Sequence, residues 1–220
     1  MVLATVVDLD ETLVDSSASW QRVLGAVAAR HGGSWTTRDW AAIQGTSTAH
    51  WSAYVARKCP DLTPEAAVAE CVDGMVEAIR DGRVALLPGA AELGTTAAGL
   101  GPVGLVSASP RRYVEAAVTA FAFAPHLRVT VAGEDVRHGK PAPDPYLLAA
   151  RRLGVRPEDC VAVEDSGSGI RSARAAGMTV LAVPNPVTAQ DLDTLRLADH
   201  QATDARIAAK VLTAVLGPRG

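Results

Sequence analysis

The chain has 220 residues, of which 48% are hydrophobic and 20% are charged, and its formal net charge at pH 7 is −3. These values are typical of one sizeable soluble domain, or of a core domain that carries a smaller one. No run is rich in lysine and arginine, which argues against binding to nucleic acid or to an anionic membrane. No apolar stretch approaches the ~20 residues that a membrane-spanning helix needs.

The cysteines, Cys59, Cys71 and Cys160, are odd in number and show no CxxC spacing. This pattern argues against a disulfide scaffold and against a structural zinc site, and it favours a reducing compartment. The N-terminus has no basic leader, and acids interrupt its apolar run from position 8. We therefore expect no signal peptide and a cytoplasmic protein. We also expect a monomer or a weak homodimer.

The first predicted strand covers roughly residues 3–9 and ends in two carboxylates, those of Asp8 and Asp10. An unpaired carboxylate at the edge of a core is costly, because it loses its hydration. Residues i and i+2 of a strand share a face, so we expect Asp8 and Asp10 to converge while Leu9 points away. Such a pair requires a proton or a cation. A strand followed by an ordinary polar turn is the competing interpretation.

Residues 17–82 contain helical patterns and no strand pattern. The Thr63-Pro64-Glu65 segment is typical of a helix start, because it combines a capping hydroxyl, a proline in the first turn and an acid near the positive end of the helix dipole. Four helices without an intervening strand predict a small helical bundle. The expected helices run from about residue 17 to a stop at Gly32-Gly33, and over about 37–43, 47–57 and 63–80.

From Pro88 onward, short aliphatic strands alternate with helices, which predicts βα units and a parallel sheet buried on both faces. We expect an α/β fold: a doubly wound parallel sheet, residues 1–16 and 84–220, interrupted by a helical domain, residues 17–83. The expected strands are 103–106, 129–132, 160–163 and 179–183, and the expected helices are about 89–98, 111–121, 144–153, 168–176 and 204–216.

Polar residues follow the carboxyl ends of these strands, which is where ligands bind in open parallel sheets. They are Asp8 and Asp10, Ser107-Ala108-Ser109, Lys140, and Glu164-Asp165. Four acids in one cleft would repel one another unless a hard cation lay among them. Oxygen ligands without histidine or cysteine suit Mg²⁺ rather than zinc, and the lysine and hydroxyls suit a phosphoryl group.

The segment Asp8-Leu9-Asp10-Glu11-Thr12 resembles the first motif, DxDx[TV], of the haloacid dehalogenase-like superfamily of aspartyl-phosphate hydrolases. Ser107, Lys140 and Glu164-Asp165 resemble the other three motifs of that family, in the same order. The helical insertion is similar to the cap domain of the family, so that the resemblance covers essentially the whole chain.

The resemblance implies a role for each motif residue. Asp8 would be the nucleophile that becomes an aspartyl phosphate, and Asp10 would be the general acid and base. The phosphoryl oxygens would be held by Lys140 and by the Ser107-Ala108-Ser109 segment. Mg²⁺ would be bound by the carboxylates of Asp8 and Asp165 and the main-chain carbonyl of Asp10. Glu164 would either bind the ion directly or lie just beyond the residues that do.

Each of these residues has an ordinary structural explanation when it is taken alone. Ser107 is then a strand-end hydroxyl, Lys140 a solvated loop lysine, and Glu164-Asp165 a turn that caps the next helix. Arg111 and Arg112 are candidates for contact with a distal anionic group, with an exposed helix surface as the alternative. The chain has four tryptophans, Trp20, Trp35, Trp40 and Trp51. We expect them to lie mostly in the cap core, with Trp20 as the candidate for the cleft. We expect His50 to be exposed.

Asp10 distinguishes the branches of the family, because its phosphatases and phosphomutases have an acid two residues after the nucleophile and its dehalogenases lack one. The β-phosphoglucomutases carry a cap histidine and an arginine where this chain has Trp20 and Thr48. We therefore expect a Mg²⁺-dependent phosphatase of a small phosphorylated metabolite, for example a sugar or polyol phosphate, with hinges near Ser16–Ser17 and Arg83–Leu87. A phosphomutase is the alternative, and a non-catalytic binding module a remote one.

Overall fold

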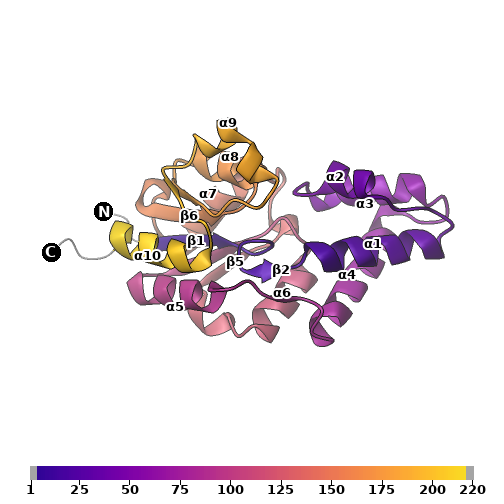
Figure 1. Cartoon of the computed structure of the whole chain (residues 1–220), viewed down its shortest axis with the longest axis horizontal. Coiled ribbons are helices and arrows are strands. Elements are labelled where there is room, and N and C mark those ends of the chain that lie inside the picture. The colour runs from indigo at the N-terminus through magenta and orange to yellow at the C-terminus, as the bar shows by residue number, and fades with distance from the viewer. Residues whose placement is uncertain (1–3, 217–220) are drawn as a thin grey trace.

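The computed structural model describes residues 4–216, which form a parallel six-stranded sheet, helices on both of its faces, and a helical cap at one end (Figure 1). The strand order is β5-β4-β1-β6-β7-β8, so the first strand lies in the middle of the sheet. The α/β fold predicted from the sequence is confirmed. The strands are β1 Ala4–Asp8, β4 Val103–Val106, β5 Val129–Val131, β6 Cys160–Glu164, β7 Thr179–Ala182 and β8 His200–Gln201.

Alternate residues of each central strand enter two different hydrophobic clusters, as the period of a strand requires. Val7 and Leu105 face the cluster that contains α5, α6 and α10, whereas Val6 and Val106 face the cluster that contains α7 and α8. Because both faces are covered, the strands are continuous apolar runs. The helices of the core are α5 Ala90–Leu100, α6 Arg111–Ala120, α7 Asp144–Leu153, α8 Gly167–Ala175, α9 Leu192–Leu195 and α10 Ala205–Leu216. Short 3₁₀ helices cover Ala124–His126, Gly133–Asp135, Pro157–Asp159 and Thr188–Gln190.

The four predicted cap helices form with bounds within about two residues of those expected. Thr36 and Asp39 make a reciprocal capping box at the start of α2, and the hydroxyl of Thr63 accepts a hydrogen bond from the backbone N–H of Ala66 at the start of α4. The hydrophobic cluster on one face of the sheet continues into the cap, so that the two packed parts share one core. The helices are α1 Ser17–Arg30, α2 Thr37–Ile43, α3 Thr48–Lys58 and α4 Pro64–Arg80.

A two-stranded antiparallel sheet lies where the chain enters and leaves the cap. Its strands are β2 Val14–Asp15 and β3 Ala85–Leu86, with Val14 paired to Leu86. The sequence did not predict this pair, because two residues are too few to show alternation. We propose that it marks the domain boundaries and hinges expected near residues 16 and 84.

Further differences from prediction are helix α9 and the short 3₁₀ helices, which were not expected, and the ends of the sheet. The first strand was expected from residue 3, which lies outside the described residues, and the edge strand β8 was not predicted. Cys59, Cys71 and Cys160 are all buried and free, in agreement with the prediction, and burial raises the pKa of Cys71 to about 12. Within residues 4–216, no helix is both long and apolar enough to cross a membrane.

Candidate active site

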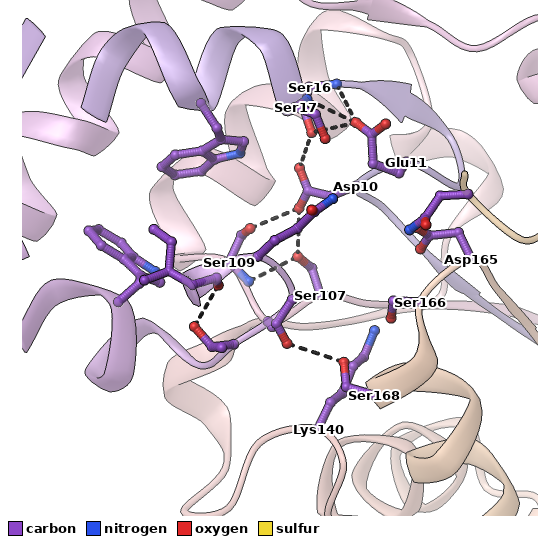
Figure 2. A pocket seen from close by; sticks show the side chains of 18 of the residues that line it. Asp10, Glu11, Ser16, Ser17, Ser107, Ser109, Lys140, Asp165, Ser166 and Ser168 are labelled. Atoms are coloured by element: carbon purple, nitrogen blue, oxygen red, sulfur yellow. Dashed lines mark hydrogen bonds between the residues drawn. The ribbon is translucent and has the colours of Figure 1, made fainter. Parts of the chain in front are cut away.

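The carboxyl ends of β1, β4 and β6 open onto a cavity that the cap covers (Figure 2). From the core, its lining includes Asp8 at the end of β1, Ser107 after β4, and Asp165 after β6. Lys140 reaches the same cavity from the segment before α7, and its peptide bond to Pro141 is cis. The parallel order of the sheet thus brings together strand ends that are far apart in the sequence.

Lys140 is a buried cation held between two carboxylates. Its Nζ donates to Asp8 Oδ1 at 2.6 Å and also donates to Glu164 Oε1. Burial opposes the charge of Lys140, but the nearby carboxylates of Asp8 and Glu164 outweigh that effect and raise the pKa of the lysine above its usual range. Lys140 is buried and paired with two carboxylates, so the interpretation as a solvated loop lysine is wrong.

Glu164 lies behind this pair, fully buried at 0% exposure. Besides Lys140, it accepts hydrogen bonds from the hydroxyl of Tyr146 and from the backbone N–H and hydroxyl of Ser166, the last two at 3.3 and 3.1 Å. A buried carboxylate with so many donors is a fixed anchor. Glu164 thus orients Lys140, while Asp8 and Asp165 line the cavity itself.

Asp8, Glu164 and Asp165 together offer a cluster of oxygen ligands, since one carboxylate oxygen from each lies within 4.8 Å of the others. Burial raises the pKa of Asp8 well above its ordinary value, against the opposing charge of Lys140. Burial and the charge of Glu164 likewise raise the pKa of Asp165 to about 8. One lysine does not balance three buried acids, so a divalent cation with oxygen preference fits this cluster, and Mg²⁺ is such an ion.

Asp165 is also oriented by two polar neighbours, one from the first motif and one from the loop after β7. The side-chain amide of Asn185 donates to Asp165 Oδ2 at 2.7 Å, and the hydroxyl of Thr12 donates to Oδ1 at 3.3 Å. Asn185 itself lies on the cavity wall. Thr12 belongs to the first motif, whereas Asn185 lies in a loop that no local sequence pattern marks.

Asp10 also lines the cavity and is surrounded by hydroxyl donors (Figure 2). Ser16 Oγ and the Tyr113 hydroxyl donate to its Oδ1 at 2.7 and 2.8 Å. Ser109 Oγ and Ser107 Oγ donate to its Oδ2 at 2.8 and 3.3 Å. This arrangement ties the carboxylate both to the start of the cap and to the segment after β4.

The two aspartates line one cavity, but within residues 4–216 they share no side-chain hydrogen-bond partner. β1 ends at Asp8 rather than at residue 9, so Asp10 lies beyond the strand and its orientation does not follow from strand alternation. The two side chains line the same cavity, but Asp10 comes from beyond the strand, and each has its own partners: Lys140 for Asp8, and the hydroxyl cluster for Asp10.

Ala108 contributes its backbone rather than a side chain. Its carbonyl accepts a hydrogen bond from Thr48 Oγ1 of the cap at 3.1 Å, and Ser107 Oγ accepts one from the backbone N–H of Ser109 at 3.0 Å. A Cβ at Gly133 would lie 2.6 Å from the Ala108 carbonyl, so this position has no room for a side chain. The segment after β4 is thus held from both the core and the cap.

A second contact joins cap to core across the cavity rim. Ser168 lies in the first turn of α8, and Gly45 lies in the turn between α2 and α3. The Ser168 hydroxyl donates a hydrogen bond to the Gly45 carbonyl at 3.1 Å (Figure 2).

Glu11, which the sequence did not single out as a site residue, caps α1. Its carboxylate accepts hydrogen bonds from the backbone N–H groups of Ser16 and Ser17, both at 2.9 Å.

Three tryptophans of the cap line the cavity: Trp20, Trp40 and Trp51. The expectation is confirmed for Trp20, but Trp40 and Trp51 are also wall residues rather than only core. Of the cap tryptophans, Trp35 alone is absent from the described lining, and His50 is exposed as expected.

The arginines at the start of α6 are engaged elsewhere. Arg111 pairs with Asp135 at 2.5 Å and with Glu115, and Arg112 pairs with Asp73 of the cap. Neither belongs to the cavity lining within residues 4–216. The alternative of an exposed helix surface holds for Arg112, whereas Arg111 is half-buried in ion pairs at the surface.

Comparison with known proteins gives a consistent family. A family model described as haloacid dehalogenase-like hydrolase matches residues 2–177. Hexitol phosphatase A of Escherichia coli (strain K12) is 35% identical over 197 residues, which cover 88% of each chain. Fructose-1-phosphate phosphatase YqaB of the same strain is 30% identical over 181 residues, covering 81% of this chain and 94% of that protein. Protein CbbY of Rhodobacter capsulatus is 40% identical over 136 residues, 60% of this chain and 57% of CbbY.

A solved structure agrees with the sequence matches. CbbY from Rhodobacter sphaeroides in complex with phosphate superimposes with a TM-score of 0.83 at 27% identity, covering 94% of this chain and 96% of that one. A mutant of the same protein, crystallised with xylulose-(1,5)-bisphosphate, gives a TM-score of 0.83 at 26% identity. Because the family model and two phosphatases match most of the chain, it belongs to the haloacid dehalogenase-like hydrolases and is a phosphatase of that family.

Proposed function

We propose that the protein is a Mg²⁺-dependent phosphatase that hydrolyses a sugar or polyol phosphate through an aspartyl phosphate on Asp8. The hexitol and fructose-1-phosphate phosphatases among its relatives support this substrate class. The observation that carries the proposal is the Asp8–Lys140 pair at 2.6 Å on the cavity wall, because it presents a carboxylate beside a fixed cation where a phosphoryl group would lie.

Asp8 has one oxygen bound by Lys140, and its other oxygen makes no hydrogen bond within residues 4–216. In the first half-reaction a carboxylate oxygen of Asp8 attacks phosphorus, and the bond from phosphorus to the ester oxygen breaks. Lys140 and the hydroxyl of Ser107, with the backbone of Ala108 and Ser109, hold the phosphoryl oxygens. A bound Mg²⁺ would be held by Asp8, Asp165 and the Asp10 carbonyl, with Glu164 behind, and would neutralise negative charge there.

Asp10 moves the proton in both halves of the reaction. It donates a proton to the departing ester oxygen, which leaves as an alcohol. Asp10 then takes a proton from the water that attacks phosphorus, the bond between phosphorus and Asp8 breaks, and inorganic phosphate leaves. Its hydroxyl partners, Ser16 and Tyr113 among them, hold the carboxylate in place for both transfers.

Cap closure supports the same chemistry, because it excludes water while the aspartyl phosphate forms. The contacts from Thr48 to Ala108 and from Ser168 to Gly45 hold the cap against the core in this structure. We propose that these contacts break when substrate enters and product leaves.

The test is phosphate release from a panel of sugar and polyol phosphates, with and without Mg²⁺, using Asp8→Asn as the control. The proposal expects release that requires both Mg²⁺ and Asp8. Equal rates for the variant and the wild type would remove Asp8 from the role of nucleophile. A phosphomutase would instead interconvert sugar phosphates and require a bisphosphate primer, and this outcome would replace the hydrolase assignment.

A further inference from the structure

The cap presents an aromatic wall to the cavity. Trp20 comes from α1, Trp40 from α2 and Trp51 from α3, so three separate helices contribute one indole each. The ring centroids of Trp20 and Trp51 lie 6.0 Å apart, and the Trp20 ring also meets the Tyr113 ring edge-on at 5.1 Å. Trp20 and Trp51 are only 8% and 7% exposed, so both rings are fixed by packing.

Trp40 is less buried, and its helix is fixed by a charge network instead. Asp39, the neighbour of Trp40, accepts hydrogen bonds from Thr36 and Tyr54, each at 2.7 Å, and pairs with Lys58 at 2.5 Å. These contacts anchor the short helix α2 to α3. The third indole is thus held in position although α2 has only seven residues.

The charged side chains of the cavity lining are mostly acidic. Within residues 4–216, the only cationic side chain in the lining is that of Lys140, and it is already bound to Asp8 and Glu164. The acids of the lining are Asp8, Asp10, Glu11 and Asp165. A second anionic group on the substrate would therefore face carboxylates and indoles without a free cation to neutralise it.

The lining does offer neutral polar groups near the indoles. The amide of Gln44 and the hydroxyl of Ser17 line the cavity, and neither side chain makes a hydrogen bond within the described part of the chain. Unpaired neutral donors and acceptors beside an apolar wall suit a ligand that has both hydroxyls and a C–H face.

We infer that the substrate carries a single phosphate on an uncharged polyhydroxy body whose C–H face packs on Trp20, Trp40 and Trp51. A second phosphate or a carboxylate on that body is excluded by the charge of the lining. This inference rests on the proposed phosphatase function and narrows its substrate class.

The first experiment measures kcat/KM for two esters that differ in the body. The alcohol part of ethyl phosphate is very small and has no hydroxyl groups, whereas that of a hexitol monophosphate presents hydroxyls and a C–H face. Trp40→Ala is expected to lower kcat/KM for the hexitol ester by about tenfold and for ethyl phosphate by less than about threefold, because only the former ester covers the indole. Trp51→Phe gives a second, smaller change at a buried position. Trp35→Phe, a cap tryptophan outside the lining, is the matched control and is expected to change neither value.

The second experiment compares fructose 1-phosphate with fructose 1,6-bisphosphate, which differ by one phosphate. The wild type is expected to prefer the monophosphate by about 100-fold in kcat/KM, since the second phosphate meets no cation. Gln44→Arg should raise kcat/KM for the bisphosphate by roughly tenfold, because a charge-assisted hydrogen bond becomes available. Ala41→Arg adds the same charge to α2 outside the lining and should leave the bisphosphate value unchanged.

The outcomes separate the inference from the function on which it rests. If the wild type hydrolyses none of the esters, the phosphatase function proposed for these substrates fails. If it hydrolyses ethyl phosphate and Trp40→Ala slows both esters equally, the aromatic wall does not bind the body and the inference is wrong. Equal wild-type activity on the two fructose esters would overturn the exclusion of a second anion.

Discussion

The ammonium group of Lys140 partly neutralises the buried acids of the site, because it is the shared ion-pair partner of Asp8 and Glu164. All three side chains are at most 8% exposed, so water replaces none of these contacts. A buried ion cluster of this kind contributes little net stability while complete, but removal of one member leaves uncompensated charge. The lysine therefore has a structural role in addition to the phosphate contact proposed for it.

We predict that Lys140→Met lowers the free energy of unfolding by about 3–5 kcal/mol, measured by urea denaturation, and abolishes phosphatase activity. Lys210→Met removes an exposed lysine and is the matched control, with an expected change within about 0.5 kcal/mol. Unchanged stability of the Lys140 variant would mean that Asp8 and Glu164 are protonated together in the folded protein.

Asp10 is a second residue whose role can be separated from folding. Asp10→Asn keeps an oxygen that can accept from Ser16 and Tyr113, so the variant should remain folded. We predict that it slows both the formation and the hydrolysis of the aspartyl phosphate by about 10²–10⁴-fold, with a smaller effect on KM. Rapid-quench kinetics measures the two steps separately. A rate within about twofold of the wild type would assign the proton transfers to another group.

At the scale of elements, the first turn of α8 depends on a missing side chain. A Cβ at Gly169 would lie 2.0 Å from the carboxylate of Glu164, and that carboxylate cannot retreat because Lys140, Tyr146 and Ser166 hold it. The helix can therefore begin directly beside Glu164, the partner of Lys140, only if position 169 is glycine.

We predict that Gly169→Ala destabilises the protein by about 1–3 kcal/mol and lowers kcat by displacing Glu164 and, through it, Lys140. The control is Gly99→Ala on the exposed face of α5, where a Cβ meets no atom within 4 Å. That variant should be neutral or more stable by up to about 1 kcal/mol, because alanine favours the helix. Thermal denaturation and a phosphatase assay of both variants test the contrast. Full activity in Gly169→Ala would show that Glu164 does not position Lys140.

Most elements could be predicted because each carries its own local signal. The helix that starts at Pro64 has a capping threonine, a first-turn proline and apolar spacing, and it forms as expected. The pair β2–β3 has no such signal, since it forms only where the segments that enter and leave the cap lie side by side. Its register follows from tertiary packing, so the sequence pattern cannot reveal it.

For the whole molecule, the buried acids link stability to pH and to metal. The folded-state pKa of Asp165 is raised from 3.8 to about 8. The folded protein therefore holds a proton that the unfolded chain releases near pH 4, and the folded state is penalised progressively as pH rises from about 4 to 8. A divalent cation that binds the ionised acids would remove this penalty.

We predict that the melting temperature of the metal-free protein falls between about pH 5 and pH 8, and that Mg²⁺ raises it more at pH 8 than at pH 5. At saturating Mg²⁺ the shift at pH 8 should be on the order of 5 °C. Differential scanning calorimetry with and without EDTA measures the effect, and Asp165→Asn should reduce both the pH slope and the Mg²⁺ shift. A shift that is larger at pH 5 would contradict the assignment of these acids as the metal site.

The sequence by itself determined the α/β class, the helical insertion, the three strand ends that carry Asp8, Ser107 and Glu164-Asp165, and the candidate Lys140 in the segment before α7. Periodicity, helix caps and short motifs are local features of the sequence, so they can be recognised without knowledge of the fold. Tertiary structure alone decided that hydroxyls surround Asp10, that Tyr146 donates to Glu164 while Gly169 leaves room for it, and that three tryptophans line the cavity. These contacts join residues from separate elements, and the direction of a side chain across such a junction depends on packing, which no local pattern specifies.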